Sequence, residues 1–227
     1  PHRYRELGID VQFGSARLTS PTEVEVTAAD GTVRTHTTRF VLLCTGSRPD
    51  LPTIDGLDPA LALTSENLFT IDAPPSSLVV VGGGSMGVET AQALRRLGVH
   101  VTVLERLPTL LPHEEPGLVD RLTDVLLAEG VVVYCNADVR RVQHGPDGHV
   151  TVQATVGNDG TDVRIDAGGI LLATGRRPNT EGLGLDAAGV TSTAVGIITD
   201  DRGRTTARTV YAAGDVTGVR QLTNAAG

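Results

Sequence analysis

Lysine is absent from this 227-residue chain, although basic residues are not. All 19 basic residues are arginines scattered along the sequence, so we attribute the bias to genomic base composition and not to function. The formal net charge is −8. Nucleic acids and anionic membrane surfaces both require a basic face. The sequence therefore predicts no nucleic-acid partner and no membrane partner.

Long apolar runs are also lacking. No stretch approaches the roughly 18 apolar residues that a membrane span needs, and residues 1–5 lack the apolar region of a secretory signal. The chain does not begin with Met, which favours a segment of a longer protein. We therefore expect a soluble, cytoplasmic segment.

Closely spaced redox, metal-binding and hydrolytic motifs are missing as well. Cys44 and Cys135 lie far apart in apolar, strand-like runs, and we expect both to be small buried residues and not a disulfide. His113, His144 and His149 show no ligand-like spacing, so no metal site is expected. Neither a G-x-S-x-G motif nor a pair of carboxylates indicates hydrolysis.

The N-terminal part is rich in β-forming residues. Three such segments, at 11–18, 22–29 and 33–46, predict an antiparallel meander. The last of them becomes wholly apolar at 40–44, which indicates a strand buried on both faces. Two loops rich in Pro, Gly and Ser, 47–59 and 73–77, indicate a domain boundary.

From residue 78 onward, strands alternate with helices. The expected elements are strands at 78–81, 99–104 and 131–135 and helices at 86–97 and 116–129. Strands joined by crossover helices predict a doubly wound parallel sheet. Three segments with period-two alternation then predict a second meander, which leads into an apolar strand at 169–173. The region 196–218 carries one short strand and a final strand at 210–213.

A glycine cluster follows the strand at 78–81. Gly82, Gly84 and Gly87 fill the pattern G-x-G-x-x-G at the start of a helix. In such motifs the first glycine permits a tight turn, the second lets the backbone approach a pyrophosphate, and the third lets helix and strand pack closely. Glu105 ends the next strand, where an acid suits the ribose hydroxyls of NAD. The alternative is a glycine-rich turn without a ligand.

Two charged residues leave alternatives open. Arg106 could neutralise a 2′-phosphate and admit NADP, whereas Glu105 would repel that phosphate, so NAD is favoured. Glu89 is expected in the first helical turn. It is either stabilised there by the helix dipole without a function, or it reaches the nicotinamide end of a cofactor.

The segments 40–49 and 169–179 share one form, an apolar strand followed by Thr-Gly, a basic residue and Pro. Each also follows a meander. Two copies of one unit suggest two related nucleotide-binding domains, of which only the second is complete.

In this order, the segments 44–57, 63–69, 79–105, 171–185 and 209–218 resemble the flavoprotein pyridine nucleotide-disulfide oxidoreductases, which include dihydrolipoyl dehydrogenase, mercuric reductase and glutathione reductase. The spacing from 63–69 to the glycine cluster is closer to that of dihydrolipoyl dehydrogenase and mercuric reductase than to that of the ferredoxin reductase-like relatives. The resemblance implies an α/β fold. A Rossmann-like NAD(P)-binding domain with an inserted meander would cover 76–196, and parts of an FAD-binding domain would cover 1–75 and 197–227.

The family's roles carry over to matching positions as implications of the resemblance. On the NAD(P) side they fall on Gly82, Gly83, Gly84, Ser85, Met86 and Gly87 at the pyrophosphate, Glu89 toward the nicotinamide, Glu105 with Arg106 at the adenosine ribose, Val139 near the adenine, and Ala173, Thr174, Gly175 and Arg176 at the nicotinamide side. On the FAD side, Thr45, Gly46 and Ser47 would border the flavin cofactor and Asp215 would bind its ribityl chain.

Several family features are missing from the sequence. They are the FAD-binding glycine motif, the redox-active CxxxxC, and a C-terminal domain with a catalytic His, which would begin after 222–227 and through which the parent would form a homodimer. No catalytic residue is therefore assigned. Ser85 stands where some members have a Tyr that gates the nicotinamide pocket.

The resemblance implies hydride transfer between NAD(P)H and FAD, with a disulfide, a metal ion or a quinone as the final partner. The alternative is an isolated dinucleotide-binding module without turnover. A third hypothesis, a flavin-free NAD dehydrogenase, would need a catalytic His or Lys facing the nicotinamide. The sequence offers no Lys and no His near the motif ends.

Overall fold

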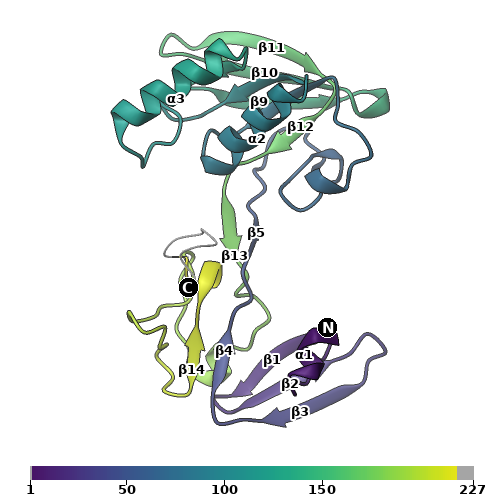
Figure 1. The fold of residues 1–227 in the computed structure, drawn as a ribbon, viewed down its shortest axis with the longest axis vertical. Coiled ribbons are helices and arrows are strands. Elements are labelled where there is room, and N and C mark those ends of the chain that lie inside the picture. Colours follow the sequence, from purple (N-terminus) through teal and green to yellow (C-terminus); the bar gives the residue numbers. More distant parts are fainter. Residues whose placement is uncertain (1, 219–227) are drawn as a thin grey trace. The chain divides into compact units, whose positions relative to one another are not determined.

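The computed structural model describes residues 2–218 and divides into two compact units (Figure 1). Residues 49–175 form one, here the central unit, and the described residues of 1–48 and 176–227 form the other, here the flanking unit. Residues 222–227, after which a C-terminal domain is expected, lie outside the described part of the chain.

A four-stranded parallel sheet forms the middle of the central unit. Its strand order is β12-β6-β7-β8. The strands are β6 (Ser77–Val81), β7 (His100–Leu104), β8 (Val132–Tyr134) and β12 (Ile170–Leu172). Consecutive strands from β6 to β8 are joined by helices, so the predicted parallel sheet with crossover helices is confirmed.

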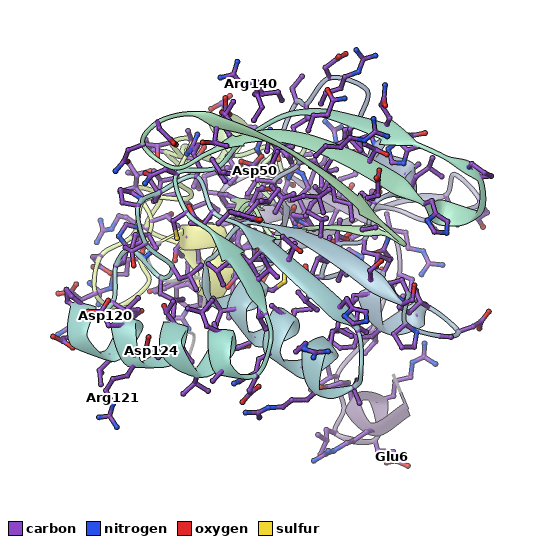
Figure 2. The ribbon with its side chains drawn as sticks, turned by 90° about the horizontal axis from the view of Figure 1, so that it is seen from above. Glu6, Asp50, Asp120, Arg121, Asp124 and Arg140 are labelled. Atoms are coloured by element: carbon purple, nitrogen blue, oxygen red, sulfur yellow. The ribbon has the colours of Figure 1, made fainter. Side chains whose placement is uncertain are left out.

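Two helices, α2 (Ser85–Arg96) and α3 (Pro116–Ala128), pack on one face of this sheet. Alternate strand residues such as Val80 and Val103 share a buried cluster with Ala91 of α2 and Leu126 of α3. Figure 2 shows the charged residues of α3 on its outer side, away from the sheet; they are Asp120, Arg121 and Asp124. Among the described helices, none is both long and apolar enough to cross a membrane.

The opposite face of the sheet is covered by an antiparallel meander. Its strands are β9 (Asp138–His144), β10 (Val150–Val156) and β11 (Thr161–Ala167), in the order β11-β10-β9, with a short turn of helix at Pro146–Gly148. Every second residue of β10, from Val150 to Val156, is buried against residues of the sheet such as Val79 and Leu172. The period-two pattern in this part of the sequence therefore reflects the burial of one face of β10.

The central unit begins earlier in the chain than the expected boundary at 75/76. Backbone bonds hold the segment 49–75 to this unit, since Leu63 bridges to Leu171 and Val142 donates to the carbonyl of Asp55 at 2.8 Å. Two short helical turns, Pro59–Leu61 and Leu68–Thr70, lie in the same segment.

The central unit also ends before the expected 196/197 boundary. Leu185, Ala188 and Val190 belong to the core of the flanking unit, so the chain returns to that unit at residue 176. The assignment of the two units to an NAD(P)-binding and an FAD-binding domain stays a prediction.

The flanking unit contains three small sheets. β1 (Ser15–Ser20), β2 (Glu23–Thr27) and β3 (Val33–Thr37) form the first meander, and β4 (Val41–Leu43) pairs in parallel with β14 (Val210–Ala212). The third sheet pairs β5 (Ser47–Pro49), whose last residue already belongs to the central unit, with β13 (Arg176–Pro178). Helical turns lie at His2–Glu6 (α1), Asp186–Ala188 and Gly214–Thr217. Of the short strand expected early in 196–218, the structure shows an isolated bridge between Ser192 and Ile197.

The prediction of one strand over 33–46, buried on both faces at 40–44, is wrong. A bend at Arg39, spanned by a hydrogen bond from the hydroxyl of Thr38 to the carbonyl of Phe40, separates β3 from β4. In β4, Leu43 is 8% exposed and lies in the core, whereas Leu42 is 63% exposed. Within the described chain β4 pairs with β14 alone, and the core covers only one of its faces.

The two cysteines differ from each other in their surroundings. Cys44 is exposed because it follows β4 on the uncovered side, so the expectation that it is buried is wrong. Cys135 is half-buried, and both thiols are free. Burial, together with the negative charge of Glu105, raises the pKa of the Cys135 thiol.

Candidate functional site

A cavity of about 600 Å³ lies in the central unit where β6, β7 and β12 end. In open α/β sheets, ligands bind beyond the carboxyl ends of the strands. The structure brings eight of the predicted site residues together in the wall of this cavity: Gly82, Gly84, Glu105, Arg106, Val139, Ala173, Thr174 and Gly175. Another cavity, of about 370 Å³, lies in the flanking unit and contains none of the predicted residues.

The three motif glycines differ in what an added Cβ would meet. Gly82 has φ of 110°, which L side chains rarely adopt, and a Cβ there would collide with the carbonyl oxygen of Ala173. A Cβ on Gly87 would collide with the carbonyl oxygen of Gly82, so helix and strand could not pack as they do. A Cβ on Gly84 would meet nothing within 4 Å, because this residue faces the open cavity.

Helix α2 begins immediately after this glycine turn (residues 82–84). Gly84 occupies the N-cap position, and no side chain there caps the first N–H groups. Uncapped N–H groups and the partial positive charge of the helix N-terminus favour an anion. Ser85 is exposed, and Met86 packs against the core beside the helices. The beginning of α2 can therefore hold a phosphate through its backbone.

Glu105 is a buried acid with two backbone partners. It is 8% exposed, its Oε2 accepts from the N–H of Gly83, and its Oε1 accepts from the N–H of Leu107 at 2.7 Å. A carboxylate offers about four lone-pair sites, so each oxygen retains the capacity to accept a ribose hydroxyl. Sequence reasoning placed Glu105 at this site but did not anticipate that it also fixes the glycine turn.

The loop after Glu105 folds back onto the glycine turn. Leu110 is 1% exposed and fills the space beside Gly83, and the N–H of Leu111 donates to the carbonyl of Gly83 at 2.9 Å. Arg106 and His113, on either side of this fold, are exposed and line the cavity. Neither side chain makes a hydrogen bond or an ion pair with the rest of the described chain. His113 was not predicted as a site residue.

Glu89 lies in the second turn of α2, not in the first. The helix begins at Ser85, one residue earlier than expected, and its first turn contains no acid. The dipole interaction proposed for Glu89 decays within the first turn, so that part of the prediction is wrong. The side chain is exposed, and its contact with a nicotinamide stays a prediction.

Four further predicted residues gather in the flanking unit. Arg176 Nε donates to Ser47 Oγ at 2.6 Å and lies 3.6 Å from Asp215 Oδ2, while Ser47 Oγ donates to the same Asp215 oxygen at 2.6 Å. Thr45 Oγ1 donates to the carbonyl of Asn179 at 2.8 Å. Arg176 thus lies with Ser47 and Asp215, in a different unit from Ala173–Gly175, with which the sequence grouped it.

A bidentate ion pair in the flanking unit gives a pH-dependent prediction. Arg48 donates to both carboxylate oxygens of Glu181, at 2.7 and 2.9 Å, and these hydrogen bonds are the main cause, with backbone hydrogen bonds second, of the lowering of the pKa of Glu181 from 4.5 to about 2. Because its pKa is lowered, Glu181 stabilises the fold through this pair at pH values above the ordinary pKa of a glutamate. This contribution disappears as the pH falls toward 2.

We expect an NMR titration of the Glu181 carboxyl to have its midpoint near 2 in the chain, and a clearly higher midpoint, closer to the ordinary value of 4.5, in an Arg48→Met variant. A midpoint near 4.5 in the unmodified chain would show that the ion pair does not persist in solution.

Within the described residues, no group of three or more His, Cys, Asp and Glu side chains is arranged to hold a metal ion.

Comparison with known proteins supports the same interpretation of the sequence. Residues 3–227 match the family described as pyridine nucleotide-disulphide oxidoreductase. A mercuric reductase from Streptomyces lividans is 36% identical over 213 residues, which cover 93% of this chain and 44% of that protein. A dihydrolipoyl dehydrogenase from Chlorobaculum tepidum is 35% identical over 216 residues, which cover 94% of this chain and 45% of that protein.

Solved structures are similar over almost the whole chain. The HOCl-induced flavoprotein disulfide reductase RclA from Escherichia coli has a TM-score of 0.85 and 28% identity, covering 99% of this chain and 50% of that one. LpdA from Mycobacterium tuberculosis has a TM-score of 0.85 and 31% identity, with coverages of 99% and 49%. The chain spans about half the length of these relatives. The resemblance seen in the sequence is confirmed, and the chain belongs to the pyridine nucleotide-disulphide oxidoreductase family.

Proposed function

We propose that the central unit binds NAD(P)H, and that the chain is the NAD(P)-binding part of a flavin-dependent oxidoreductase passing hydride between NAD(P)H and FAD. One observation carries this proposal. The glycine turn, the uncapped start of α2 and the carboxylate of Glu105 all border one cavity at the ends of parallel strands. The relatives include a mercuric reductase and a disulfide reductase, which favours a metal ion or a disulfide as final acceptor over a quinone.

The dinucleotide is proposed to lie along this cavity. Backbone N–H groups at the start of α2 would donate to the pyrophosphate, and Glu105 would accept from the adenosine ribose hydroxyls. Val139, half-buried in the cavity wall, would contact the adenine. Ala173, Thr174 and Gly175 would border the nicotinamide side. Here the hydroxyl of Thr174 donates to the carbonyl of Asp50 at 2.7 Å and holds the backbone in place.

The proposed preference is for NAD, with NADP admitted at lower affinity. The carboxylate of Glu105 would repel a 2′-phosphate, whereas the exposed guanidinium of Arg106, next to it in the cavity wall, would attract one.

For the flavin, the proposal assigns Thr45, Gly46, Ser47 and Asp215. The hydroxyl of Ser47 and the carboxylate of Asp215 already form one polar cluster with Arg176, which suits a polyhydroxyl chain. When bound, FAD would supply the redox chemistry, and the protein would supply position and electrostatics. A homodimer of the parent protein, formed through a C-terminal domain, is part of the same proposal.

The second candidate function is a dinucleotide-binding module without turnover. It is favoured for this chain by one observation, that the chain spans about half the length of its relatives. Titration of the purified chain with FAD, followed by quenching of flavin fluorescence, distinguishes the two. Saturable quenching supports a flavin site within the chain, and unchanged fluorescence supports the binding module.

The proposed site is tested by calorimetric titration of the chain with NADH and NADPH, alongside Glu105→Ala. We expect saturable NADH binding, weaker NADPH binding, and a loss of about tenfold or more in NADH affinity in the variant, because hydrogen bonds to the ribose and to Gly83 are lost together. Arg106→Ala is the matched control. It should weaken NADPH binding and leave NADH binding unchanged. An unaltered NADH affinity in Glu105→Ala would remove Glu105 from the site.

A further inference from the structure

The loop between β7 and α3 is held in an unusual conformation beside the glycine turn. Leu111 has φ of 44°, a left-handed conformation that is uncommon for a residue with a side chain. It is maintained because Leu110 is buried next to Gly83 and because the N–H of Leu111 is bonded to the carbonyl of Gly83. The backbone therefore leaves the glycine turn just before Pro112 and His113, and both residues line the cavity.

The His113 side chain makes no contact with the described chain that would stabilise the fold through a hydrogen bond or an ion pair. Its side chain is exposed, and it makes no hydrogen bond or ion pair within the described part of the chain. Arg106, the other unpartnered basic side chain of this wall, comes directly after Glu105 and so lies at the ribose end. His113 comes two residues after Leu111, whose N–H is bonded to the carbonyl of Gly83, so its segment enters the cavity wall directly from the glycine turn.

The charges around His113 make a protonated imidazole a better partner for an anion than a neutral one. The cavity wall contributes the carboxylates of Asp50, Glu105 and Asp138 and the guanidinium of Arg106. In its own segment, His113 is followed by Glu114 and by Glu115, whose carboxylate caps the N–H of Leu118 at 2.9 Å. A pyrophosphate adds negative charge to a wall that is already rich in acids. One further positive charge there strengthens its binding.

We infer that His113 is a ligand to the pyrophosphate of the dinucleotide, so that dinucleotide affinity increases as the imidazole gains its proton. This inference rests on the proposed function. Histidine is the residue whose charge changes between pH 5 and 8, and a charge-assisted hydrogen bond from imidazolium to phosphate is stronger than a neutral one. The site would then hold NADH more tightly at pH 6 than at pH 8.

The test compares the chain with His113→Gln, His113→Arg and His100→Gln by calorimetry at pH 6 and pH 8, with NADH and NADPH. His100 is exposed at the beginning of β7 and does not belong to the cavity wall, so its variant is the matched control. We expect the unmodified chain and His100→Gln to bind NADH about three to ten times more tightly at pH 6 than at pH 8. His113→Gln should lose this difference, and His113→Arg should bind tightly at both pH values.

Comparing the affinities for NADH and NADPH distinguishes this inference from the alternatives. An equal loss of NADH and NADPH affinity in His113→Gln at pH 6 supports the pyrophosphate. A loss confined to NADPH would assign His113 to the 2′-phosphate and overturn the inference. Unchanged binding in His113→Gln would overturn the inference and leave the proposed function standing. An unmodified chain that binds neither coenzyme would overturn both. Thermal unfolding of each variant confirms that it is folded.

Discussion

Replacing Gly84 with alanine is expected to lower NADH affinity at least about thirtyfold, equivalent to about 2 kcal/mol, and to leave the fold intact. Gly84 has φ of −72° and ψ of −178°, which alanine adopts without strain, and an added Cβ meets nothing within 4 Å. The added methyl group occupies the cavity at the point where the pyrophosphate would approach the backbone. The free energy of unfolding should therefore change by less than about 1 kcal/mol.

Calorimetry with NADH measures the first quantity and urea denaturation measures the second. Gly145→Ala is the matched control, because Gly145 has φ of −101° and its added Cβ would make ordinary contacts, at 3.6 Å, outside the cavity wall. This control should bind NADH as the unmodified chain does. If Gly84→Ala also binds NADH normally, the dinucleotide does not approach the glycine turn, and the proposed orientation has to be abandoned.

Replacing Gly87 with alanine is expected to have the opposite signature, a loss of folding stability. Gly87 is buried inside α2, and its added Cβ would collide with the carbonyl oxygen of Gly82 and lie 3.3 Å from Cβ of Ala173. Alanine favours a helix over glycine by about 1 kcal/mol, but overpacking costs about 1–3 kcal/mol, and this collision involves the backbone of Gly82, directly after the core strand β6. We expect a net loss of about 2 kcal/mol in the free energy of unfolding.

Urea denaturation followed by far-UV circular dichroism measures this loss. The two units need not unfold together, so near-UV or NMR signals from the central unit should be followed separately. A Gly87→Ala variant that is as stable as the unmodified chain, or more stable, would mean that α2 lies farther from β6 than the structure places it.

The elements that could be predicted from the sequence are those with a strong local pattern. The parallel strands β6, β7 and β12 are short apolar runs, and α2 starts directly behind a glycine motif whose spacing reflects backbone contacts. The alternation in β10 follows from its one buried face. Such patterns reflect burial and steric limits acting on neighbouring residues, so they are visible without the fold.

The features that could not be predicted depend on contacts between distant segments. Leu42 is exposed because of which strands flank β4, and the sequence does not show these. Residues 49–75 belong to the central unit because Leu63 pairs with Leu171, which lies far away in the sequence. The place of His113 depends on the left-handed backbone at Leu111. The acid at position 105 is visible in the sequence directly after a strand, but its second role depends on its bond to the N–H of Gly83, 22 residues earlier.

A crystal structure of the chain with NADH bound tests the central claim most directly. The account predicts that the pyrophosphate lies at the first N–H groups of α2 beside Gly84, with the adenosine ribose hydroxyls bonded to Glu105. A dinucleotide bound elsewhere on the chain, or one whose ribose lies away from Glu105, would contradict the account.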